Sequence, residues 1–116
     1  MRQDSITNTQ YEDLLQIGYE GKEDCSVDEA IEWLRRKYNV VVYNKAAPFV
    51  DPKSRGDILY AYAVKFCNVK RGYNFRENVG EGTWNKNIYT AKKEAITIAV
   101  KYIKAQKERK AKIVKI

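Results

Sequence analysis

The spacing of apolar residues predicts a helix in the segment that follows Ser26. Ser26, with Glu29 three residues later, has the spacing of a capping box and marks the start of the helix. Apolar residues then recur every three or four positions, at Ala30, Ile31, Leu34 and Tyr38. The pattern ends near Asn39, so we expect one amphipathic helix between these two polar residues.

Two further helices are predicted, one near each end of the chain. Thr9 and Glu12 have capping-box spacing, which predicts a short helix over 10–17 that ends at Gly18. Thr90 is the predicted N-cap of the last helix, which continues to about Ala105. Its expected apolar stripe consists of Ala95, Ile98, Ala99, Tyr102 and Ile103. Beyond it, the basic tail 106–116 is expected to be frayed.

The middle of the chain has the pattern of strands. Residues 40–43 are β-branched and short, whereas 44–57 contains both prolines and is expected to be an irregular connection. Residues 57–68 alternate and are apolar on both faces, which predicts a central strand and leaves room for the N-terminal helix on the second face. A third strand over 73–84 contains Gly80 and Gly82, which indicate a bulge or a close backbone approach.

Together these segments predict the fold class α+β. We expect a three-stranded antiparallel sheet with helices packed on it, in the order α-α-β-β-β-α. The length of 116 residues predicts a single domain over 1–116, with an acidic N-terminal segment over 1–25.

The charges are divided along the chain, although the formal net charge is only +7. Residues 1–32 contain nine acids and two bases, while 33–90 contain eleven bases and four acids, and 91–116 nine bases and two acids. Two arrangements fit this division. Either the acidic and basic segments are neighbours within one fold, or one of them faces a partner.

The composition argues against catalysis. The chain has no histidine, and its two cysteines, Cys25 and Cys67, are far apart, so no triad and no zinc site are recognisable. Cys67 is expected to be a small core residue, and Glu77 and Glu81 are expected to be plain surface charges. We therefore expect no enzyme, no cofactor, no metal and no small-molecule ligand.

The same composition bears on the compartment. No apolar run is long enough to span a membrane, and the first residues lack the apolar core of a signal peptide. These features, with the sparse cysteines, predict a cytoplasmic protein.

The remaining chemical signal is the mixture of aromatic and basic residues. Lys92 and Lys93 lie in the first turn of the last helix, where the helix dipole disfavours cations unless a phosphate is bound. Trp84 and Tyr73 are expected to be exposed beside turns, whereas Tyr60, Tyr62 and Phe66 are expected to be core or half-core residues. The candidate nucleic-acid-binding residues are Lys53, Arg55, Lys92, Lys93, Lys101 and Lys104, with the tail lysines from Lys107 onwards.

These residues resemble part of the double-stranded RNA-binding domain. The helix–strand–strand–strand–helix order of 26–105 matches that family, and its Lys-Lys-x-Ala-Lys motif is matched by Lys92, Lys93 and Ala95, with Ile96 in place of the third lysine. The resemblance implies that the lysines grip phosphates across the major groove of RNA. The chain is also similar to small proteins of bacterial phages and mobile elements, which implies a compact α+β domain without a defined activity.

Two functions are therefore expected. The first is a non-enzymatic domain that binds a protein partner or a second copy of itself, since charge of both signs is segregated. The alternative is a nucleic-acid-binding module that uses the basic C-terminal helix, unless the acidic N-terminal segment folds over that helix and masks it.

Overall fold

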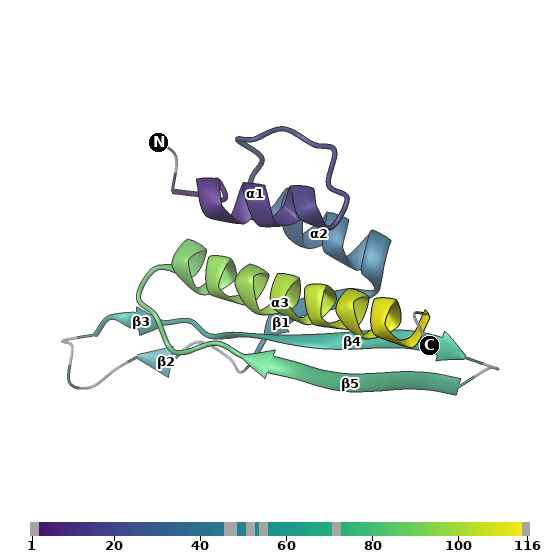
Figure 1. The fold of residues 1–116 in the computed structure, drawn as a ribbon. Helices are drawn as coiled ribbons and strands as arrows, with labels where there is room; N and C mark the ends of the chain where they lie inside the picture. Colours follow the sequence, from purple (N-terminus) through teal and green to yellow (C-terminus); the bar gives the residue numbers. More distant parts are fainter. Residues whose placement is uncertain (1–2, 46–48, 51–52, 54–55, 71–72, 115–116) are drawn as a thin grey trace.

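The computed structural model describes residues 3–45, 49–50, 53, 56–70 and 73–114 (Figure 1). The helices and strands, in chain order, are α1 (Asn8–Gln16), α2 (Val27–Tyr38), β1 (Val40–Asn44), β2 (Phe49–Val50), β3 (Ile58–Leu59), β4 (Tyr62–Lys70), β5 (Tyr73–Glu81) and α3 (Ile88–Val114). The predicted α+β class is confirmed.

The main sheet is antiparallel and has the order β1-β4-β5. β4 pairs with β1 through Val42 and Val64, and with β5 through Phe66 and Glu77. The central position of β4 confirms the prediction made from its two apolar faces.

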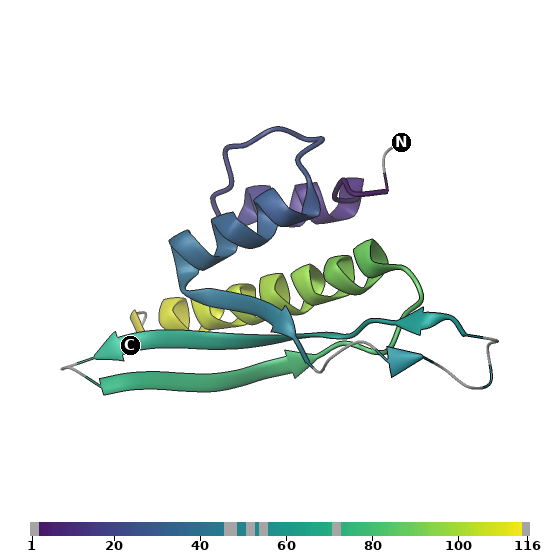
Figure 2. The ribbon, with the colours of Figure 1, turned by 180° about the vertical axis from the view of Figure 1, so that it is seen from behind.

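All three helices lie on one side of this sheet, with α3 against the strands and α1 and α2 over α3 (Figures 1 and 2). The expectation that the N-terminal helix covers the second face was therefore wrong. Leu14 and Ile17 of the α1 region are almost fully buried in the same core as Ile96 of α3. The apolar side of α3 that faces away from the sheet supplies the contact area that α1 requires.

Local capping decides where the helices begin and end. Ser26 caps α2 by accepting a hydrogen bond from the Glu29 amide, and Asn39 ends the helix in a left-handed conformation, so both predicted ends are confirmed. In α1 the capping box is formed by Thr7 and Gln10 instead of Thr9 and Glu12, so the helix begins earlier than predicted.

The start of α3 also differs from the prediction. The side-chain oxygen of Asn87, not that of Thr90, accepts hydrogen bonds from the amides of Tyr89 and Thr90. An asparagine is as good an N-cap as a threonine, so the sequence offered two starts and the earlier one is used. At its other end α3 continues to Val114, beyond the end predicted near Ala105.

Gly80 of β5 and Gly82 just after it show both of the features that were expected as alternatives. Val64 pairs with Gly80 and Lys65 with Asn78, so Val79 is the extra residue of a β-bulge. A Cβ at Gly80 would lie 2.8 Å from Cγ2 of Ile98, and one at Gly82 would lie 3.0 Å from the Tyr62 carbonyl oxygen. Glycine here allows α3 to approach the sheet closely.

The connection between β1 and β4 is more regular than predicted. β2 and β3 form a small antiparallel ladder in which Phe49 pairs with Leu59. The strand predicted over 57–68 is interrupted at Tyr60 and Ala61, where Tyr60 instead bridges to Asn85. The two prolines had predicted an irregular connection, but they do not prevent the residues between and after them from pairing. Even a ladder of two residue pairs provides hydrogen bonds for backbone groups that would otherwise bond to water.

A row of aromatic rings joins α1 to the end of α2. The rings meet edge to face, with centroids 6.5 Å apart from Tyr11 to Tyr19, 5.2 Å from Tyr19 to Trp33 and 5.7 Å from Trp33 to Tyr38. The Tyr38 hydroxyl donates a hydrogen bond to the Ile17 carbonyl. These contacts fix the N-terminal segment to α2.

Within the described part of the chain, no helix has the length and apolar character needed to cross a bilayer.

Candidate functional site

The two lysines at the start of α3 do not form a shared site. Lys92 donates a hydrogen bond to Asp28 of α2, with 2.8 Å between Nζ and Oδ1, and its amine lies 5.8 Å from the centroid of the Tyr62 ring. Only 17% of the Lys92 side chain is exposed. Partial burial opposes the charge, but the hydrogen bond and the charge of Asp28 outweigh it and raise the pKa of Lys92.

Lys93 lies on the side of α3 that meets α1. Its carbonyl oxygen accepts a hydrogen bond from the buried side chain of Gln10 at 2.7 Å, and Gln10 also donates to the Thr97 hydroxyl at 3.1 Å. The Lys93 side chain is half-buried and has no ion pair with a described residue. α1 therefore covers the surface next to it.

The other candidate lysines of α3 are also separated. Lys104 pairs with Asp13 of α1, with 2.8 Å between Nζ and Oδ1, and both side chains are about one-third exposed. Lys101 is exposed and has no ion pair within the described ranges. Acids of α2 and α1 thus hold Lys92 and Lys104, two of the candidate lysines of this helix.

The remaining candidates belong to the β2–β3 connection. Lys53 is exposed and lies between β2 and β3 in the chain. Arg55 lies outside the described residues, as do the side chains of Tyr73 and of the tail from Lys110. Trp84 is 37% exposed, as expected beside a turn.

Ile96 occupies the position at which the resemblance to the double-stranded RNA-binding domain would place a third lysine. This residue is fully buried in the core beneath α1 and α2. A lysine there would be removed from water, which costs much free energy unless the charge is paired.

The two glutamates and two cysteines considered in the sequence analysis are either paired with neighbouring side chains or at least partly buried. Glu77 accepts a hydrogen bond from the Tyr102 hydroxyl, and Glu81 pairs with Lys45 at 2.8 Å. Burial, the largest cause, raises the pKa of the Cys25 thiol. Cys67 was expected to be a core residue, but it is only half-buried on β4. No three acids, cysteines or histidines of the described residues lie close enough together to hold a metal ion.

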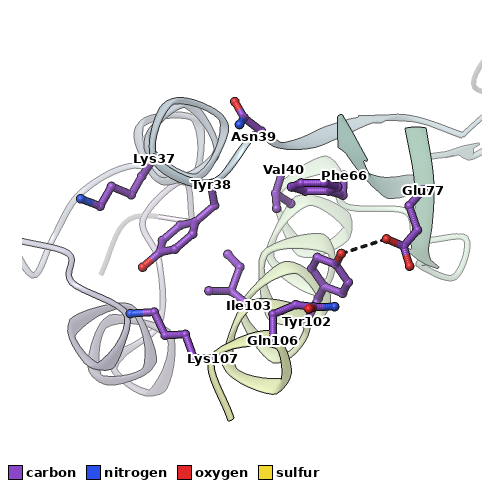
Figure 3. Close-up of a pocket in the computed structure, with 10 residues that line it drawn as sticks. All are labelled: Lys37, Tyr38, Asn39, Val40, Phe66, Glu77, Tyr102, Ile103, Gln106 and Lys107. Carbon is purple, nitrogen blue, oxygen red and sulfur yellow. Dashed lines mark hydrogen bonds between the residues drawn. The ribbon is translucent and has the colours of Figure 1, made fainter. Parts of the chain in front are cut away.

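A pocket of about 570 Å³ lies at the end of α2, between that helix, the sheet and the second half of α3 (Figure 3). Its apolar floor is formed by Val40 and Ile103, which are both buried. Its apolar walls are the rings of Tyr38, Phe66 and Tyr102. The Phe66 and Tyr102 rings lie 6.2 Å apart and are tilted against each other. Its remaining lining residues are Lys37, Asn39, Glu77, Gln106 and Lys107.

The rim of this pocket is exposed and has charges of opposite sign on its two sides. Lys37 and Lys107 lie on the Tyr38 side, and the Lys107 amine is 5.6 Å from the Tyr38 ring centroid (Figure 3). Glu77 lies on the other side, where it holds the Tyr102 hydroxyl. Neither lysine has an ion pair with a described acid.

Tyr102 is held in its neutral form at the edge of the pocket. Burial, followed by the hydrogen bond to Glu77 and its charge, raises the pKa of Tyr102, and these causes outweigh the opposing effects of the Gln106 hydrogen bond and of the Arg109 charge.

No family model, no curated protein and no solved structure matched this chain in comparisons with known proteins.

Sequence reasoning missed the pocket because its walls come from segments that are far apart in the chain. Tyr38, Tyr102 and Ile103 were assigned to core stripes, and Lys107 to a frayed tail. The available signal was the apolar stripe of α3, whose last predicted members, Tyr102 and Ile103, line the pocket.

Proposed function

We propose that this chain is a non-enzymatic domain that binds another protein. The observation that carries the proposal is the pocket at the end of α2, which has a buried apolar floor and an exposed, charged rim. A hydrophobic centre surrounded by polar side chains is the usual anatomy of a protein interface. The chain has no histidine, the side chain that most often acts as an acid or base at neutral pH, and this absence was the reason for expecting no enzyme.

The contacts of α3 weaken the two other arrangements considered. Asp28 and Asp13 hold Lys92 and Lys104 within the same chain, so these acids are not available to a second copy. The same ion pairs compete with phosphate for the lysines on which the nucleic-acid alternative depends. The element order α2-β1-β4-β5-α3 is the one implied by the resemblance to the double-stranded RNA-binding domain, which keeps that alternative worth testing.

Selection from a random peptide display library tests protein binding directly. We expect the folded domain to enrich peptides that, once synthesised, bind it at micromolar concentrations in fluorescence anisotropy. A library that stays unenriched would contradict the proposal.

Electrophoretic shifts with duplex RNA, duplex DNA and single strands at low salt test the alternative. We expect no shift at micromolar protein. The variant Asp13→Asn with Asp28→Asn releases both lysines, and a gain in RNA affinity from it would show that the acids mask a phosphate site. A salt-sensitive shift of the unmodified protein would favour the nucleic-acid function instead.

A further inference from the structure

We propose that the pocket at the end of α2 binds an acidic segment of a partner protein, which inserts one apolar side chain between Tyr38 and Tyr102 and places a carboxylate against Lys107. This inference rests on the proposed function and specifies the chemistry of the partner.

The apolar anchor follows from the floor of the pocket. Val40 is fully buried and Ile103 is 3% exposed, and they lie at the base between the Tyr38 and Phe66 rings (Figure 3). A cavity of about 570 Å³ holds a large side chain with part of the backbone on either side of it. Transfer of a leucine or phenylalanine side chain from water to this floor supplies the hydrophobic part of the affinity.

The acidic character of the partner follows from the charges of the rim. Lys37 and Lys107 face solvent without an ion pair to any acid among the described residues, and Arg109 lies close enough to Tyr102 to affect its ionisation. The single acid among the lining residues, Glu77, already accepts the Tyr102 hydrogen bond. The rim is therefore net positive, and a carboxylate is the group that complements it.

The two sides of the rim also predict the direction of the bound segment. Figure 3 places the Lys107 amine beside Tyr38 and Glu77 beside Tyr102, on opposite sides of the floor, and draws Lys37 on the Tyr38 side with its amine pointing outward. The acid of the partner therefore lies on only one side of the anchor residue, and the position on the Glu77 side is neutral or basic, since like charges repel.

Residue composition in the peptide selection provides the first test. We expect enriched peptides to share an aromatic or large aliphatic residue with Asp or Glu on one side of it. Enrichment of basic peptides, or of peptides without an apolar residue, would overturn the inference while leaving protein binding intact.

Two matched charge reversals on α3 provide the second test. Using the selected peptide as a labelled probe, we expect Lys107→Glu to weaken binding by about tenfold or more. Lys101→Glu makes the same change on the same helix at an exposed position outside the pocket, and should change the affinity by less than about twofold. Equal effects of the two variants would show that only the overall charge matters and would overturn the inference.

A third variant separates the pocket from its charge. Gln106→Trp fills the cavity from the half-exposed wall of α3 without altering any charge, and we expect it to abolish peptide binding while the thermal midpoint stays close to that of the unmodified protein. Unchanged binding by the folded variant would move the site elsewhere on the domain. A failure to enrich any peptide would instead contradict the proposed function itself.

Discussion

Lys92 and Lys93 are neighbours in the sequence, yet they serve different contacts in the structure. Successive helical residues are turned by about 100° around the axis, so two consecutive side chains do not face the same surface. Lys92 therefore meets Asp28 of α2, whereas Lys93 lies beside α1. The sequence contained the helix geometry but not the identity of the acid, because Asp28 is 64 residues away along the chain.

Gly80 is a residue at which one methyl group should have a measurable cost. We expect Gly80→Ala to lower the free energy of unfolding by about 1–3 kcal/mol, because the new Cβ would lie 2.8 Å from Cγ2 of Ile98. Urea unfolding measures the change. In the background of Ile98→Ala, which removes the opposing atom, the same substitution should cost much less, and additive effects would contradict the steric explanation.

Two tyrosines should make the stability of the protein sensitive to alkaline pH. Burial is the largest cause of a raised pKa in both Tyr19 and Tyr102, above the ordinary value of 10.0. A folded-state pKa above that of the unfolded chain contributes stability that is complete below about pH 10 and is lost as the pH rises through the folded-state pKa. We therefore expect the urea midpoint to fall above about pH 10.

The Tyr19→Phe variant isolates the part of this effect that comes from one side chain. Its urea midpoint should decline less steeply with pH than that of the unmodified protein, because phenylalanine has no proton to lose. Absorbance of tyrosinate should also develop at higher pH in the native protein than in urea. Superimposable titrations of the native and unfolded chains would contradict the assignment.

At the scale of elements, the sequence predicted most of what local interactions decide. The ends of α2 were correct because Ser26 and Asn39 make contacts within their own helix. The starts of α1 and α3 were misplaced because several adjacent residues are competent N-caps. The layer occupied by α1 could not be predicted, since it depends on which face of α3 still has apolar surface to cover.

Gln10 links α1 to α3 and gives this contact a test. Its side chain is 6% exposed, completes the capping box with Thr7 and donates to the Lys93 carbonyl and the Thr97 hydroxyl. We expect Gln10→Ala to lower the free energy of unfolding by about 1–3 kcal/mol, because a buried polar network loses its donor. Glu12→Ala, on the exposed side of the same helix, is the control and should be nearly neutral. Similar unfolding midpoints for the two variants would contradict the role given to Gln10.

At the scale of the whole molecule, folding brings acids of residues 1–32 against lysines of the C-terminal helix. Helix α1, which has two acids and no base, and helix α2, whose first turn is acidic, lie over the basic helix α3. Asp28 and Asp13 each pair with a lysine of α3. This is the first of the two arrangements that the sequence left open. The pocket was beyond sequence reasoning, because it exists only once α2, the sheet and α3 have been brought together.

This arrangement predicts the behaviour of the protein in solution. Since the described acid–lysine pairs between helices are closed within one chain, we expect light scattering to give the mass of a single chain, 13.5 kDa, at both low and high salt. Association that disappears as salt is added would show that charges on separate copies meet. Association that persists at high salt would point to an apolar contact between copies.

The aromatic row from Tyr11 to Tyr38 also gives the protein a built-in optical reporter. The Tyr19 ring centroid lies 5.2 Å from that of Trp33, so we expect Tyr19 to pass excitation energy to Trp33. The nearly perpendicular rings of Tyr11, Tyr19 and Trp33 should also give circular dichroism in the near ultraviolet. Replacement of the exposed Trp84 by phenylalanine would leave Trp33 as the single indole emitter. Its colour and intensity would then reveal when α1 and α2 separate from each other, independently of the sheet.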